Sequence, residues 1–154
     1  MTWSAVVLVH ASGERLDPDQ LLATHAPAKA TLYRQGEQDP RGRTRKISGV
    51  NIDLGEVASK QALEDLISAH FRDHAALYRE VAAVGGDVSL GIGLMVPAKE
   101  PRTVTPRAAV LRVLSETGVT VHVTGYPCMV EEFEEAGKQQ DAADEARAWM
   151  ELRR

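Results

Sequence analysis

Hydrophobic residues recur along this chain with two periods, which alternate from segment to segment between Trp3 and Tyr126. Apolar residues at every second position are typical of a strand, and apolar residues three and four positions apart are typical of a helix. In chain order, the pattern predicts a strand, a short helix, two strands, a long helix and a strand over residues 3–9, 18–25, 30–34, 47–54, 60–84 and 87–96. The first of these strands is apolar on both parities, which predicts that both of its faces are covered, or at least that it is an interior strand of the sheet.

Cap and turn residues mark where the predicted helices begin and end. Asp17 before Pro18 provides an N-cap acceptor followed by the residue type favoured at the first helical position. Ser59 is an N-cap candidate for the long helix, and Gly85 and Gly86 end it. Residues 35–46 are polar and rich in turn formers, so the strands on either side are expected to form a hairpin with a long tip.

A further helix-strand unit follows the first six elements. Residues 106–117 predict a helix that ends at Gly118, and Val119, Val121 and Val123 then alternate with polar residues as in a half-buried strand. The predicted fold is α+β: a ferredoxin-like βαββαβ sandwich, extended by this unit, with a mixed or antiparallel sheet of about five strands. We divide the chain into a sandwich domain, residues 1–128, and an acidic linker with a C-terminal helix, residues 129–154. The apolar side of that last helix consists of Ala142, Ala146, Trp149 and Met150.

Composition and charge narrow the classes of function. The chain has 154 residues, 44% hydrophobic and 26% charged, which is ordinary for a globular domain that forms a core without metal or disulfide. Its formal net charge is −4, whereas a nucleic-acid-binding domain usually carries a basic surface. Nucleic acid is therefore not an expected partner.

Cysteine content and the N-terminal region bear on the compartment. Cys128 is the only cysteine, which excludes an intrachain disulfide and fits a reducing compartment. The apolar run at residues 5–9 is too short for a signal-peptide core or a membrane span. We expect a cytoplasmic protein that is not associated with a membrane and has no cofactor.

His70 and His74 are the sharpest candidate site. They are four residues apart, so they project from one face of the long helix within its apolar stripe. Two imidazoles at this spacing could bind zinc, with His10 or His122 arriving from the sheet as a third ligand. The alternative is a pair of partly buried histidines that are hydrogen-bonded to the backbone or to neighbouring side chains. The Glu that follows the first His in a zinc-protease helix is missing here.

The hairpin tip carries the basic cluster of the chain. The cluster consists of Arg41, Arg43, Arg45 and Lys46. Arg43 and Arg45, together with Tyr33 and Arg34 at the end of the preceding strand, form a candidate binding set for a phosphate, an RNA backbone or an acidic protein surface. The alternative is a solvated loop tip, since no glycine-rich phosphate loop precedes a helix here.

Two weaker candidates lie towards the C-terminus. Cys128 and His122 could form a thiol nucleophile and its base, but no third group that would orient them is evident, and an inert thiol is the alternative. Four glutamates flank Phe133 at positions 131, 132, 134 and 135. They predict a solvated segment, or an acidic surface for a basic partner. We assign no catalytic residue and no metal ligand, so an enzymatic function is less expected than a binding one.

The ordered pattern resembles a bacterial family known as domain of unknown function four-two-seven-nine. The matching pieces lie within residues 6–128 and include Asp17-Pro18, Pro27, Arg34-Gln35-Gly36, the long helix, the 86–94 strand and the ending at 117–126. One departure is that the family often has a tryptophan in its third strand, where Gly49 and Val50 stand here. The resemblance implies the α+β fold and implies no catalytic residues.

Three hypotheses of function follow. The first is a non-enzymatic binding module of the kind represented by the immunity proteins that some small bacterial families provide against toxins. The second is a small-ligand or metal sensor, or an enzyme, with a pocket between the long helix and the sheet that uses His70 and His74. The third is a homodimer formed through a sheet edge or through Trp149 and Met150.

Overall fold

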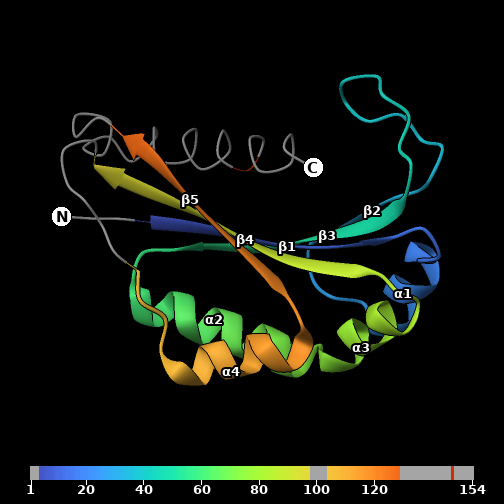
Figure 1. Cartoon of the computed structure of the whole chain (residues 1–154). Helices are drawn as coiled ribbons and strands as arrows, with labels where there is room; N and C mark the ends of the chain where they lie inside the picture. The colour runs from blue at the N-terminus through green and yellow to red at the C-terminus, as the bar shows by residue number, and fades with distance from the viewer. Residues whose placement is uncertain (1–3, 98–103, 129–146, 148–154) are drawn as a thin grey trace.

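One mixed sheet of five strands carries four helices on one of its faces in the computed structural model, which describes residues 4–97, 104–128 and 147 (Figure 1). The strands are β1 (Ser4–Gly13), β2 (Ala30–Tyr33), β3 (Ser48–Val57), β4 (Asp87–Pro97) and β5 (Thr120–Cys128). The helices are α1 (Pro18–His25), α2 (Lys60–Asp73), α3 (Ala75–Ala83) and α4 (Ala108–Thr117). The predicted α+β class is confirmed.

The strand order is β2-β3-β1-β4-β5, so β1 lies at the centre and β2 and β5 lie at the edges. The first four strands of this row pair antiparallel, and β5 runs parallel to β4. The parallel pair is possible because α4 crosses over between the two strands. The α4–β5 unit therefore extends the sheet as predicted. The finer assignment to a ferredoxin-like sandwich stays a prediction.

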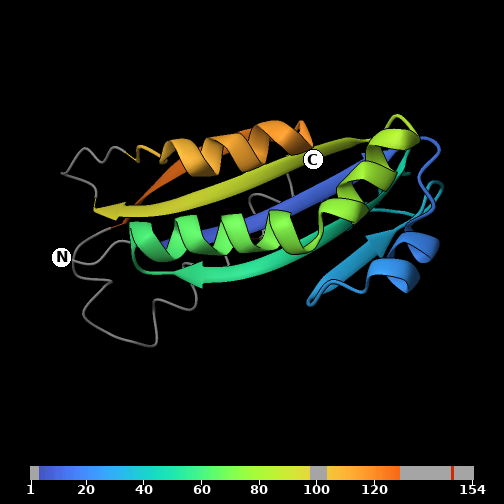
Figure 2. The same cartoon turned by 90° about the horizontal axis from the view of Figure 1, so that it is seen from below.

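Alternate residues of the strands face the helices and form the core. On β1 these residues are Ala5, Val7, Val9 and Ala11. They pack with Leu63, Ile67 and Phe71 of α2, Leu77, Tyr78 and Val81 of α3, and Val110 and Leu114 of α4. Figure 2 shows α2 lying along β1 and β3, with α4 beside it nearer to the β5 edge. The space between the sheet and the helices is thus filled by side chains.

The predicted single helix over residues 60–84 is wrong, because the chain forms two helices that meet at His74. His74 leaves the helical region, with φ −109° and ψ 22°, and its backbone N–H donates to the carbonyl oxygen of His70 at 3.0 Å. Figure 2 shows that α3 turns at this point and follows the curvature of the sheet. A straight helix of this length would diverge from a curved sheet at one end. The break at His74 therefore keeps Leu77 and Val81 packed in the core.

The opposite face of β1 is buried as well. Val6 and Leu8 have exposed fractions of 0% and 2%, although they point away from the helices. The prediction that both faces of this strand are covered is therefore confirmed. Arg147 lies on this second face, where its Nε is 3.2 Å from Oδ2 of Asp53. Apart from Arg147, the predicted C-terminal helix lies outside the described residues.

Candidate functional site

His70 and His74 lie side by side, with ring centroids 4.7 Å apart, but they do not form an open site. His70 is 9% exposed, and its Nε2 shares a hydrogen bond of 2.5 Å with the hydroxyl of Tyr78 on α3. Burial, and then the neighbouring His74, lower the pKa of His70 from 6.5 to about 4. Burial also raises the pKa of Tyr78. The neutral imidazole thus joins α2 to α3 across their break, which matches the hydrogen-bonded alternative.

The described residues offer no metal centre around these histidines. No group of three or more histidine, cysteine, aspartate or glutamate side chains that could hold an ion is found within residues 4–97, 104–128 and 147. His10 and His122 belong to β1 and β5, on the sheet, and neither forms such a group with His70 of α2 and His74 at its C-terminal end.

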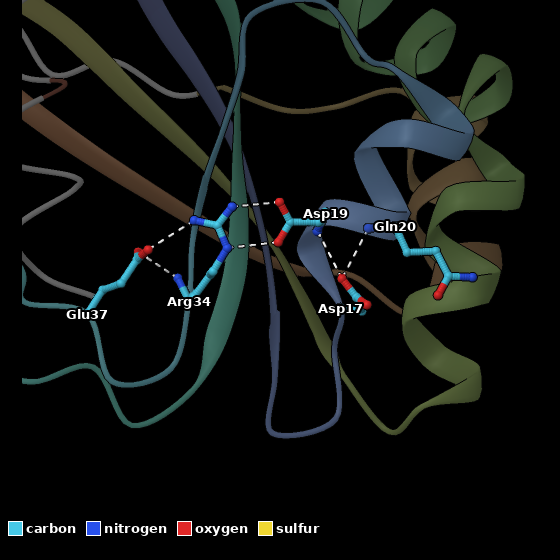
Figure 3. A network of polar contacts seen from close by, with 5 residues as sticks. All are labelled: Asp17, Asp19, Gln20, Arg34 and Glu37. Atoms are coloured by element: carbon cyan, nitrogen blue, oxygen red, sulfur yellow. Dashed lines mark hydrogen bonds and ion pairs between the residues drawn. The ribbon is translucent and has the colours of Figure 1, made fainter.

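Arg34 is held in a surface network at the start of the hairpin loop (Figure 3). Its Nη2 and Nε donate to the two carboxylate oxygens of Asp19 at 2.6 and 2.8 Å, and its Nη1 donates to Glu37 at 3.0 Å. These hydrogen bonds lower the pKa of Asp19, and the backbone N–H of Arg34 does most to lower the pKa of Glu37. Asp17 caps α1 beside this network, accepting from the N–H groups of Asp19 and Gln20 at 3.1 Å. Arg34 therefore fastens the hairpin loop to α1.

Arg43 and Arg45, the other basic residues of the predicted binding set, contact different side chains. Arg43 donates through Nε to Asp39 at 2.8 Å, and Asp39 also accepts from the backbone N–H of Arg43 at 2.9 Å. The guanidinium of Arg45 instead lies 4.0 Å from the ring centroid of Tyr33, a cation–π contact. The structure brings Tyr33 and Arg45 together but leaves Arg34 and Arg43 in local ion pairs.

Tyr33 belongs to a polar cluster that the sequence analysis did not assemble. Its hydroxyl is 3.1 Å from Nε2 of His10, and Nδ1 of His10 donates to Oδ1 of Asn51 at 2.7 Å. His10 and Asn51 are direct partners in the β1–β3 register, which no local sequence signal specifies. Gly49 provides the space for Tyr33, because a Cβ at that position would collide with the hydroxyl.

A cavity of about 330 Å³ lies between α2, α3 and α4 rather than between the long helix and the sheet. Its apolar lining consists of Phe71, Ala75, Tyr78, Ala82 and Val113. Arg72, Arg79 and Glu116 bring charge to its walls. His70 and His74 are not among its lining residues, so this is not the predicted pocket.

The outer edge of β5 exposes large hydrophobic side chains. Its Val121 and Val123 are 41% and 55% exposed, and Leu111 of α4 is 51% exposed. These are the exposed large hydrophobic residues among those that the structure describes. The prediction of a half-buried final strand is therefore wrong for both valines, because α4 leaves them uncovered. We call the outer edge of β5 together with Leu111 the β5 edge surface.

Glu64 and Arg107 position the helix beside this surface. Glu64 is a buried residue of α2, only 3% exposed, and its carboxylate accepts from the backbone N–H of Arg107 at 2.8 Å and from its guanidinium Nε. Arg107 is the N-cap residue of α4. The ion pair therefore fixes where α4 begins relative to α2, and with it the position of Leu111.

Comparisons with known proteins give no family or function for this chain. No protein-family model, no curated protein and no solved structure matches this chain. The resemblance to the domain-of-unknown-function family stays a prediction. Among the described residues, no helix is long and apolar enough to cross a membrane.

Proposed function

We propose that this chain is a non-catalytic binding domain that binds a protein partner through its β5 edge surface. The observation that carries the proposal is the exposure of Val121, Val123 and Leu111 at the one edge strand of nine residues. Edge strands present unpaired N–H and C=O groups, and proteins normally protect them with charge, proline or a covering element. From Thr120 to Tyr126 this strand has no Lys, Arg, Asp or Glu, and its one proline, Pro127, stands near its C-terminal end, so most of the strand lacks that protection.

The polar side chains support the same proposal. The pairs Arg34–Asp19 and Arg107–Glu64 each join two segments of the fold, and Arg43–Asp39 is an ion pair within the hairpin loop. His70 is engaged with Tyr78, and His10 is engaged with Asn51. A catalytic centre would instead require ionisable groups that converge on a space for substrate.

Affinity capture from cells of the source organism tests the proposal. The tagged full chain should retain a protein at about equal molar ratio, and Val123→Lys should abolish this retention because it places a charge on the apolar surface. Thr31→Lys is the matched control, since Thr31 is an exposed residue on β2, the opposite edge strand. Equal retention by Val123→Lys and by the unchanged chain would contradict the proposal.

Small-ligand binding is a second candidate function, favoured by the cavity between the helices. Arg72 and Arg79 stand on its wall without an ion pair to another described residue, beside the aromatic rings of Phe71 and Tyr78. This combination suits an anion with an apolar body. Anilinonaphthalene sulfonate is a suitable fluorescent probe of that kind. Arg72→Gln with Arg79→Gln should weaken its binding about fivefold, whereas Arg41→Gln at the hairpin tip should not change it.

The idea of an immunity-like protein remains a proposal about the class of partner. It rests on the small size and negative charge of the chain and on the glutamates at 131, 132, 134 and 135, which lie outside the described residues. Charge complementarity with a basic enzyme would then add to binding at the β5 edge surface.

A further inference from the structure

The sequence of β5 reads the same in both directions around one residue. Thr120-Val121-His122-Val123-Thr124 is a palindrome centred on His122. Two antiparallel copies of this strand, related by a two-fold axis at His122, would place Val121 opposite Val123 of the other copy. Each threonine would likewise meet a threonine. A two-fold interface requires a surface that is complementary to itself, and this strand meets that requirement.

Val121 and Val123 project from the same face of the sheet, the face on which a second copy would cover them. Val121 and Val123 are register partners of Leu90 and Ile92 on β4, which belong to the core on the helix side of the sheet. Register partners on adjacent strands project to the same face. The valines therefore face the helix side, at the margin that α4 leaves open.

The outer flank of α4 continues the uncharged surface. Val113, Glu116 and Thr117 line the cavity shared with α2 and α3, so they mark the inner flank of the helix. At 3.6 residues per turn, Leu111 and Ser115 lie on the opposite flank, towards the β5 edge. Among the residues that the structure describes, Figure 2 shows no other helix on that side of α4. A second copy related by the same axis would bring its own α4 alongside this flank.

Resting on the proposed function of the β5 edge surface, we propose that the partner at this surface is a second copy of this chain. The two β5 strands pair antiparallel around His122 and join the two sheets into one continuous sheet. Valine pairs form on the helix side, and Leu111 of each copy packs over them. Charge favours this occupant, because from Thr120 to Tyr126 no acidic or basic side chain other than His122 would meet its own copy across the axis.

Light scattering of the full chain after gel filtration, over a range of concentrations, tests the proposal. The unchanged chain should have the mass of two copies, and Val123→Lys should raise the dissociation constant at least about tenfold, because two like charges then approach across the axis. Thr31→Lys on the other edge should leave the mass unchanged. A chain that is monomeric throughout, or a dimer that Val123→Lys does not weaken, would overturn the proposal.

Cysteine cross-linking locates the axis. In a Cys128→Ser background, His122→Cys should give a covalent dimer on mild oxidation, since residues that pair directly across strands have Cβ atoms about 4.5 to 5.5 Å apart. Thr31→Cys in the same background should remain monomeric under denaturing conditions. Absence of the cross-link in a scattering-proven dimer would overturn the proposed register.

The two proposals fail in different ways. If the chain is monomeric but Val123→Lys abolishes the capture of another protein, only the identity of the partner is wrong. If Val123→Lys alters neither self-association nor the capture of any protein, the proposed function itself is wrong.

Discussion

The carboxylate of Glu64 on α2 accepts two hydrogen bonds from a single residue, Arg107, one from its backbone N–H and one from its guanidinium. Glu64 is almost fully buried, whereas the side chain of Arg107 is half exposed. A buried carboxylate is costly unless it is paired, so this contact both neutralises Glu64 and holds the start of α4.

Replacing this carboxylate should destabilise the fold. Glu64→Ala is expected to lower the free energy of unfolding by about 2 kcal/mol, because it removes charge-assisted hydrogen bonds from a buried position and leaves a cavity. Urea unfolding followed by circular dichroism measures this change. The control is Asp65→Asn, an exposed neighbour 3.6 Å from Arg107, which should change stability by less than about 0.5 kcal/mol. Equal effects of the two substitutions would contradict the assigned role of Glu64.

His70 should make stability depend on pH. Its pKa is about 4 in the folded chain and 6.5 as the ordinary value, so the unfolded chain binds the proton more readily between these pH values. Stability is then fully present above about pH 6.5, falls as the pH decreases towards about 4, and loses at most about 3 kcal/mol through this group. His70→Gln, which can still bond to Tyr78 but does not titrate, should reduce the difference in unfolding free energy between pH 7 and pH 4.5. An unchanged difference would show that His70 is not the group responsible.

Gly49 should not tolerate a side chain. A Cβ at this position would collide with the hydroxyl of Tyr33 and would lie 2.7 Å from the carbonyl oxygen of Ala11. Gly49→Ala is therefore expected to lower the free energy of unfolding by about 1 to 3 kcal/mol. Gly125→Ala is the matched control, because its Cβ would meet nothing closer than 3.9 Å. A smaller effect of Gly49→Ala in a Tyr33→Ala background would identify the tyrosine as one source of the clash.

Arg34 should control the titration of the two carboxylates beside it. Arg34→Gln removes the hydrogen bonds that lower the pKa of Asp19 and of Glu37, so both pKa values should rise towards their ordinary values. Nuclear magnetic resonance of the side-chain carboxyl carbons during a pH titration measures each value separately. Arg41→Gln should leave both unchanged, since Arg41 contacts Asp39 only through its backbone N–H. Titration curves unaffected by Arg34→Gln would contradict the network in Figure 3.

Local signals in the sequence were sufficient for several elements. The predicted bounds of α1 are confirmed, and Asp17 caps it as expected, because a cap and its helix are only a few residues apart. Ser59 likewise accepts from the N–H of Ala62 at the start of α2. The hairpin of β2 and β3 also follows from the turn-forming residues between its strands.

The candidate sites were less accessible to sequence reasoning. Tyr33, His10 and Asn51 come from three different strands, and only their register brings them together. Arg34 and Arg43 were expected to bind a ligand, yet each finds a carboxylate of the same fold. His70 was the sharpest candidate, and its bond to Tyr78 depends on a helix break that the apolar period does not reveal.

The sequence by itself determined the order of strands and helices, the bounds of α1 and the two covered faces of β1, because period and capping act over a few neighbouring residues. Only the tertiary structure decided where the long helical segment breaks, since the curvature of the sheet sets that point. It also decided that Val121 and Val123 are exposed. Alternation shows that one face of a strand is apolar, but whether that face is covered depends on how far α4 extends over the edge of the sheet.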